Sequence, residues 1–213
     1  MNRLLSKTFL WMFLGLFVTF ITGYIVSINE NMLLSIFGGP IFWIIIILEF
    51  ALVIFFSARV HKMKPMTAKI CFLLYSFVSG LTFSSIFVGF ELGSVMYVFL
   101  ISAVIFAIFG AIGYFTNVNL NKLGTFLLMG LLALIICCIV NLFVGNSTFD
   151  LIISIIALLI FFGFTAYDIQ GMKILSNMGV DHDVVAINGA FQLYLDFINI
   201  FLHLLSIIGD SRD

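Results

Sequence analysis

The feature that most constrains this chain is a series of long apolar segments that recur along nearly its whole length. Each is about 20 residues long, which is the length an α-helix needs to cross the hydrocarbon core of a bilayer. Hydrophobic residues make up 63% of the sequence and charged residues only 9%, whereas soluble domains are about 25% charged. We therefore predict an all-α membrane protein that forms a single seven-helix transmembrane domain over residues 1–213. The expected spans are Thr8–Ile28, Ile41–Ser57, Ala68–Phe90, Ser94–Phe115, Leu123–Val144, Leu151–Ile169 and Ala186–Ile208.

The charge balance and the cysteines exclude several other classes of protein. The formal net charge is −1, so no basic surface points to a nucleic-acid partner, and the expected surroundings are the lipid bilayer. Cys71, Cys137 and Cys138 lie in apolar runs, which is typical of buried cysteines and not of a disulfide framework or a metal site. We expect no tightly bound cofactor.

The distribution of Lys and Arg predicts an orientation. The N-terminus and the loops after the second, fourth and sixth spans carry eight of the nine basic residues, and only Arg212 lies on the opposite side. Because basic loops stay in the cytoplasm, we expect the N-terminus inside and the C-terminus outside. If Ala186–Ile208 were instead a re-entrant segment, Arg212 would lie inside.

Two rows of small residues, spaced four apart, predict close contacts between helices, because small side chains let backbones approach in lipid. The rows are Ser76, Gly80 and Ser84 in the third span, and Ala103, Ala107 and Ala111 in the fourth.

The last apolar segment carries polar residues at spacings of four, four, three and four. These are Asn188, Gln192, Asp196, Asn199 and His203. At about 100° per residue they fit within an arc of roughly 80° on a helix. A carboxylate near the membrane centre costs at least a few kcal/mol unless it faces protein or water, so this stripe is expected to face a cavity or a partner helix and to form part of an ion pathway. The alternative for His203 is a histidine that packs in the core.

Four ionisable residues inside or at the ends of spans are candidates for function. The depths implied by helix geometry place Asp168, Asp196 and Arg59 in one layer near the cytoplasmic side, with Glu49 about 15 Å from Arg59, near the midplane. Two close carboxylates in a low dielectric cannot both ionise cheaply and tend to share a proton. Arg59 would hold one of them ionised, and the deprotonated pair would suit transient binding of Ca²⁺, a hard cation.

Simpler interpretations remain for three of these residues. Asp168 would cap the inner end of its helix near water. Arg59 would mark the inner membrane edge by extending its charged group to the interface. Glu49, otherwise a member of the ion pathway, would be a buried, protonated and hydrogen-bonded acid.

The stretches GFTAYDIQ at 163–170 and GAFQLYLDFINIFLHLL at 189–205 resemble the Bax-inhibitor family, also called the transmembrane Bax inhibitor motif family, and above all its short bacterial members. The resemblance covers nearly the whole chain. It implies a bacterial plasma-membrane protein whose C-terminal helix is central and wrapped by the other six in two three-helix layers. It further implies a calcium-leak channel in which Asp168 and Asp196 form a pH-sensing and gating pair, with Arg59 alternating its pairing with them.

Other functions use the same residues. A proton-coupled calcium exchanger would drive calcium uphill, whereas a channel only dissipates its gradient. An intramembrane aspartyl protease would use the two aspartates to activate water, but Asp196 lies in LYLDF and not in GxGD, and no PAL motif follows; we therefore expect no enzyme. A membrane protein that acts only through protein partners is a further alternative, and the sequence names no such partner.

Overall fold

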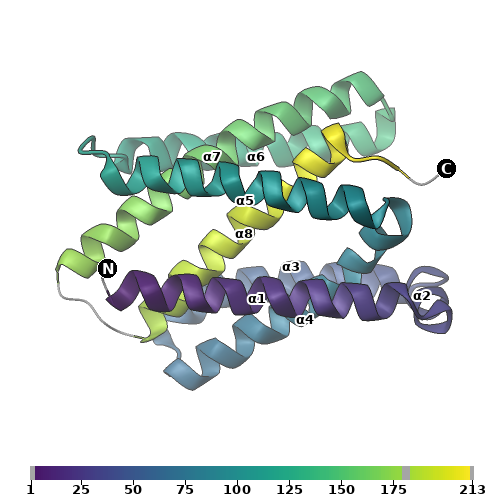
Figure 1. Ribbon diagram of the computed structural model, residues 1–213, viewed down its shortest axis with the longest axis horizontal. Helices are drawn as coiled ribbons and strands as arrows, with labels where there is room; N and C mark the ends of the chain where they lie inside the picture. Colours follow the sequence, from purple (N-terminus) through teal and green to yellow (C-terminus); the bar gives the residue numbers. More distant parts are fainter. Residues whose placement is uncertain (1–2, 179–182, 212–213) are drawn as a thin grey trace. The chain divides into compact units, whose positions relative to one another are not determined.

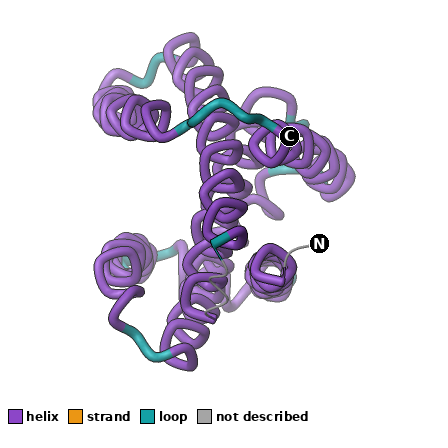
Figure 2. Tube along the Cα trace, turned by 90° about the vertical axis from the view of Figure 1, so that its left-hand side faces the viewer, coloured by secondary structure: helices purple, strands orange, loops and turns teal. Residues whose placement is uncertain are grey.

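The computed structural model describes residues 3–178 and 183–211, and Arg212 lies outside these ranges. The described chain is almost entirely helical (Figure 2). Its helices, labelled in Figure 1, are α1 (Arg3–Ser27), α2 (Glu30–Phe37), α3 (Ile41–Arg59), the 3₁₀ turn η1 (Val60–Lys62), α4 (Pro65–Gly89), α5 (Leu92–Phe115), α6 (Asn121–Val144), α7 (Ser147–Asn177) and α8 (Asp183–Ile208).

In this described part, seven helices are long and apolar enough to cross a membrane, namely all of the α-helices except α2. Each of them overlaps one of the spans expected from the sequence. The prediction of an all-α integral membrane protein with seven spans is confirmed.

Two elements differ from the prediction. The short helix α2 lies between the first two spans. Asn29 caps its N-terminus, because the Asn29 side chain accepts a hydrogen bond from the backbone N–H of Met32 at 3.2 Å. Helix α7 does not end near Ile169 but continues to Asn177. Asp168 therefore lies within a helix, and the interpretation that it caps a helix end is wrong.

The chain divides into two compact units. The first contains α1 to α4 and the part of α8 up to Tyr194. Here α1 packs closely on α4, because a Cβ atom on Gly15 would lie 2.4 Å from the Phe72 ring and one on Gly80 would lie 2.5 Å from Thr22. Ser76, Gly80 and Ser84 are all buried, so the small-residue row predicted for this helix does mark a close contact.

The first half of α8 lies in the core of this unit. Phe191 is 1% exposed, and its ring contacts those of Phe56 on α3 and of Phe72 and Tyr75 on α4, with centroid distances of 4.5, 6.0 and 5.1 Å. Apolar burial and edge-to-face aromatic contacts therefore hold this end of α8 in place.

The second unit contains α5, α6, α7 up to Leu175, and α8 from Leu195. Phe197 of α8 packs against Phe99 and Phe106 of α5, with ring centroids 5.1 and 5.7 Å apart. The long helices of the first unit are thus α1, α3 and α4, and those of the second unit are α5, α6 and α7.

The small-residue row predicted in the fourth span is wrong. Ala107 and Ala111 are exposed, and the buried row of α5 is instead Ser102, Phe106 and Gly110. Alanines at four-residue spacing on a lipid-facing surface give the same pattern as alanines at a helix contact, so the spacing alone did not identify the packed face.

Candidate functional site

The candidate site is centred on Asp196, whose carboxyl group lies in the core of the second unit. Asp196 lies in the middle of α8 and is only 5% exposed. Among the residues that the structure describes, its Oδ2 atom is buried and has no hydrogen-bond partner. Buried polar atoms without a hydrogen-bond partner are uncommon in proteins. A bound proton, an ion or a water molecule would supply the partner that this atom lacks.

Thr165 of α7 is the hydroxyl neighbour of this carboxyl group. Its Oγ1 atom already donates to the backbone carbonyl of Phe161 at 2.9 Å, one turn earlier in the same helix. A hydroxyl group has a single proton, so Thr165 has none left for Asp196 and its oxygen is available mainly as an acceptor. A proton on Asp196 would give this contact the donor that it needs.

Asp168 lies three residues after Thr165 on α7, and residues three apart share a helix face. Its side chain is half-buried and lies close enough to Asp196 for an electrostatic interaction. Both aspartates belong to the second unit. The structure thus places two carboxyl groups from α7 and α8 within electrostatic reach of each other.

The residues around Asp168 fix this part of α7, and sequence reasoning did not identify their role. Gln170 is buried, and its side-chain amide bridges the loop between α5 and α6: Nε2 donates to Val118 O at 2.7 Å, and Oε1 accepts from Leu120 N at 2.9 Å. Lys173 donates to the carbonyl oxygen of Tyr114 and lies 5.2 Å from the centre of its ring. The feature of the sequence that could have identified this role is a glutamine at the end of an apolar segment, Gln170.

The polar stripe of α8 does not have a uniform environment. Asn188 and Asn199 are half-buried, and Asn199 donates to Leu195 O in its own helix at 2.7 Å, whereas Gln192 is exposed. His203 is half-buried, 3.2 Å from Ser154 Oγ on α7, and its ring stacks on Phe161 at 6.4 Å. These contacts fit the core-packing alternative for His203, and the participation of the stripe in an ion pathway stays a prediction.

Arg59 and Glu49 both lie on α3, in the first unit. Arg59 is the last residue of the helix and is exposed, so its expected pairing with the two aspartates stays a prediction. Glu49 is half-buried, and Thr82 Oγ1 of α4 donates to its Oε2 atom at 3.3 Å.

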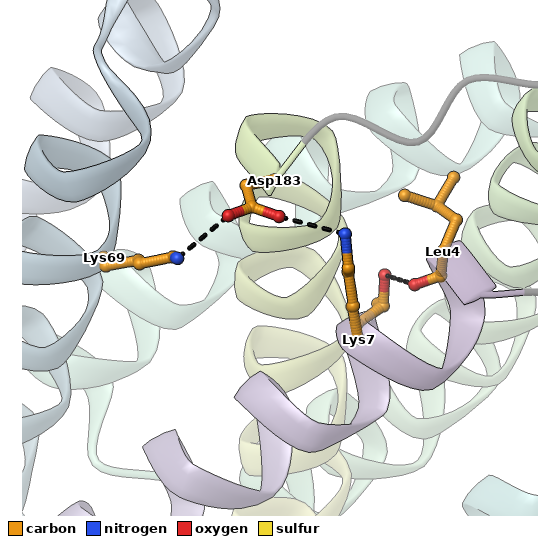
Figure 3. A network of polar contacts seen from close by, with 5 residues as sticks. Leu4, Lys7, Lys69 and Asp183 are labelled. Carbon is orange, nitrogen blue, oxygen red and sulfur yellow. Dashed lines mark hydrogen bonds and ion pairs between the residues drawn. The ribbon is translucent and has the colours of Figure 1, made fainter.

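The start of α8 is joined to two other helices by ion pairs. The carboxylate of Asp183 contacts Lys7 of α1 at 3.1 Å and Lys69 of α4 at 3.0 Å, and Figure 3 shows it between the two lysines. Lys69 also lies 5.4 Å from the centre of the Trp11 ring. Sequence reasoning assigned Asp183 only to a polar loop.

A tightly bound metal ion has no obvious site in the described residues, where no group of three or more His, Cys, Asp and Glu side chains could hold one. A hollow along α6 and α7 is lined by apolar side chains such as Phe126 and Ile156. Such a lining offers no carboxylate ligands for a cation.

Comparison with known proteins agrees with this architecture. The family model described as "Inhibitor of apoptosis-promoting Bax1" matches residues 1–213. A protein of Borreliella burgdorferi is 37% identical, over 100% of this chain and 94% of its own length. A protein of Deinococcus radiodurans is 35% identical, over 98% and 90%. Inner membrane protein YbhL of Escherichia coli K12 is 33% identical, over 98% and 92%. Seven apolar helices, a match along the whole chain and relatives of this similarity establish that the protein belongs to the Bax inhibitor family.

Proposed function

We propose that this protein is a pH-sensitive, calcium-permeable leak channel gated by Asp168 and Asp196. The observation that carries the proposal is the environment of Asp196, a buried carboxyl group that lacks a donor to Oδ2 among the described residues and has a second carboxyl group within electrostatic reach. Two such groups cannot both ionise cheaply in a low dielectric. They would therefore titrate as one unit.

Proton binding would change the contact between α7 and α8. A single shared proton allows a hydrogen bond between the two carboxyl groups, which joins the helices, and such charge-assisted bonds are short and strong. When the proton leaves, two negative charges face each other in an apolar core and repel. Their oxygen atoms are then hard ligands suited to a passing Ca²⁺ ion. Arg59 would compete for the ionised form.

Calcium flux into proteoliposomes tests this proposal. The wild-type protein is compared with Asp168→Asn and Asp196→Asn over a range of pH, and with Asp150→Asn as a control, because Asp150 is an exposed acid on the same helix α7. We expect a pH-dependent flux in the wild type and in the control, and a flux that no longer depends on pH in the other two variants. Flux that is unchanged in both of them would rule out the pair as the gate.

The same vesicles distinguish the alternatives. An exchanger would accumulate calcium against its gradient when a proton gradient is imposed, whereas a channel would not. Cleavage of a membrane substrate that is lost in Asp196→Asn would instead favour an aspartyl protease. By analogy with inner membrane protein YbhL, we propose that the protein lies in the plasma membrane of a bacterium. The distribution of Lys and Arg favours an N-terminus in the cytoplasm.

A further inference from the structure

The first unit carries its basic residues at one end, which we call the basic end. Four helix termini lie there, the starts of α1, α4 and α8 and the end of α3, which continues through η1 into α4. Six of the nine Lys and Arg residues of the chain belong to these segments, namely Arg3, Lys7, Arg59, Lys62, Lys64 and Lys69. The second unit has only Lys122 and Lys173, so the positive charge is concentrated in the first unit.

One acid joins three of the helices at the basic end. The carboxylate of Asp183, the first residue of α8, contacts the ammonium groups of Lys7 on α1 at 3.1 Å and of Lys69 on α4 at 3.0 Å (Figure 3). The Lys69 ammonium group also lies 5.4 Å from the centre of the Trp11 ring. Trp11 follows Lys7 by four residues and therefore shares a face of α1 with it. Two lysines and a tryptophan from two helices thus gather beside one carboxylate.

The carboxylate of Asp183 does not balance the positive charge of the basic end. Among the other described acids of the first unit, Glu30 and Glu91 follow the far ends of α1 and α4, and Glu49 lies in the middle of α3. Asp181, two residues before Asp183, lies outside the described residues. Six positive charges therefore face at most these two negative charges, and the basic end keeps a positive excess.

The protein surface next to this charge is apolar. Met66 and Ile70 in the first turns of α4 are 66% and 55% exposed, and Leu10 of α1 is 58% exposed. Tryptophan rings are enriched at the level of the lipid headgroups, and lysines extend their ammonium groups from an apolar surface into the same layer. A partner that matches both the charge and the apolar surface is an amphiphile with a negative headgroup. A nucleic acid or an acidic protein would match only the charge.

We propose that the basic end binds the headgroup of an anionic phospholipid, with Lys7 and Lys69 holding its phosphate group beside Trp11. Clusters of Lys and Arg next to membrane helices attract anionic lipids. A lysine binds phosphate as a point charge, so the two ammonium groups need no fixed orientation toward it. Because Asp183 uses the same two ammonium groups, the headgroup and the ion pairs of Asp183 weaken each other.

Tryptophan fluorescence in lipid vesicles tests this proposal. The chain has two tryptophans, Trp11 at the basic end and Trp43 near the opposite end of α3. Trp43→Phe leaves Trp11 as the reporter, and Trp11→Phe leaves Trp43 as the matched control. Each protein is placed in mixed vesicles of phosphatidylglycerol and phosphatidylcholine in which one of the two lipids carries bromine atoms, which quench tryptophan fluorescence on contact.

We expect the lipid beside Trp11 to be phosphatidylglycerol in preference to phosphatidylcholine. The preference should be about fivefold or more, since this is the factor that one basic residue near an anionic surface contributes. Trp43 should show no such preference. Equal quenching of Trp11 by the two brominated lipids would overturn the proposal.

Charge substitutions in the Trp43→Phe background test the site itself. Lys7→Gln combined with Lys69→Gln should bring the preference down to that measured beside Trp43, whereas Lys122→Gln, in the second unit, should leave it unchanged. Asp183→Asn should raise the preference, because it removes the competing carboxylate. A preference that survives the loss of both lysines, or one that falls in Asp183→Asn, would overturn the assignment to this site.

Inorganic phosphate, added at constant ionic strength, distinguishes a lipid headgroup from a soluble anion. The lipid preference beside Trp11 should not change, since a soluble anion gains nothing from the apolar surface. Loss of the preference would assign the two lysines to free phosphate and overturn the lipid proposal. None of these measurements requires calcium transport, so their outcome is independent of the test of the proposed channel.

Discussion

At the scale of single residues, the side chain of Gln170 shows how one buried amide organises a loop. It supplies a donor to Val118 O and an acceptor to Leu120 N. We expect Gln170→Ala to remove both hydrogen bonds, at a cost of about 0.5–1.5 kcal/mol for each of them. The melting temperature in detergent should fall, whereas Gln192→Ala, which changes an exposed side chain, should leave it nearly unchanged. An equal change of the melting temperature in the two variants would show that the hydrogen bonds of Gln170 do not contribute to stability.

Four buried hydroxyl groups in the helices share one further property. Thr8, Ser76, Ser102 and Thr165 each donate to the carbonyl oxygen four residues earlier. A proton used in this way is not available to a neighbouring acid, so the hydroxyl oxygen acts as an acceptor. Asp196 beside Thr165 is in this situation. Sequence reasoning identified this acid but not this feature of its surroundings.

At the scale of helices, α5 approaches α7 closely at Gly113. A Cβ atom added to Gly113 would lie 2.1 Å from the carbonyl oxygen of Ala166, a backbone atom that cannot move alone. We expect Gly113→Ala to force the two helices apart and to destabilise the protein by about 1–3 kcal/mol, as overpacking usually does. This shift also moves Thr165 and Asp168, so the pH dependence of calcium flux should change with it.

The control for this substitution lies on the same helix. Gly93 has nothing within 4 Å of its added Cβ atom, and alanine forms helices better than glycine by about 1 kcal/mol. Gly93→Ala should therefore leave the melting temperature unchanged or raise it slightly. A Gly113→Ala protein as stable as the Gly93→Ala protein would contradict the close contact between α5 and α7.

The start of α8 offers a prediction about salt. Asp183 and its two lysine partners have side chains that are 26–39% exposed, so each pair should contribute only about 0.2–1 kcal/mol. We expect Asp183→Asn to lower the melting temperature slightly in dilute buffer, and the difference from the wild type to shrink as ionic strength rises, because salt screens exposed charges. Glu91→Gln serves as the control. A difference that is independent of salt would point to a packing role and not to ion pairing.

At the scale of the whole molecule, sequence reasoning predicted the features that depend on the membrane, but it missed several that depend on packing. The spans followed from length and apolarity, because a bilayer imposes both. The continuation of α7 past Ile169 was missed because Gln170 and Lys173 read as the end of an apolar run, although loop contacts satisfy both side chains. The buried face of α5 was misassigned because lipid and protein interior are equally apolar, so hydrophobicity does not distinguish them.

The orientation of the chain is the last prediction, and it belongs to the molecule as a whole. Seven spans put the two termini on opposite sides of the membrane, and eight of the nine Lys and Arg residues fall on the side of the N-terminus. Because basic loops resist translocation, we expect a reporter fused to the C-terminus to be active only if it works outside the cytoplasm. We also expect the loop just before Lys122, which is the second residue of α6, to be labelled only from the inside. If the C-terminal reporter faced the cytoplasm, α8 would not span the bilayer. Asp196 would then not lie at membrane depth, and the burial that makes it a candidate gate would need another cause.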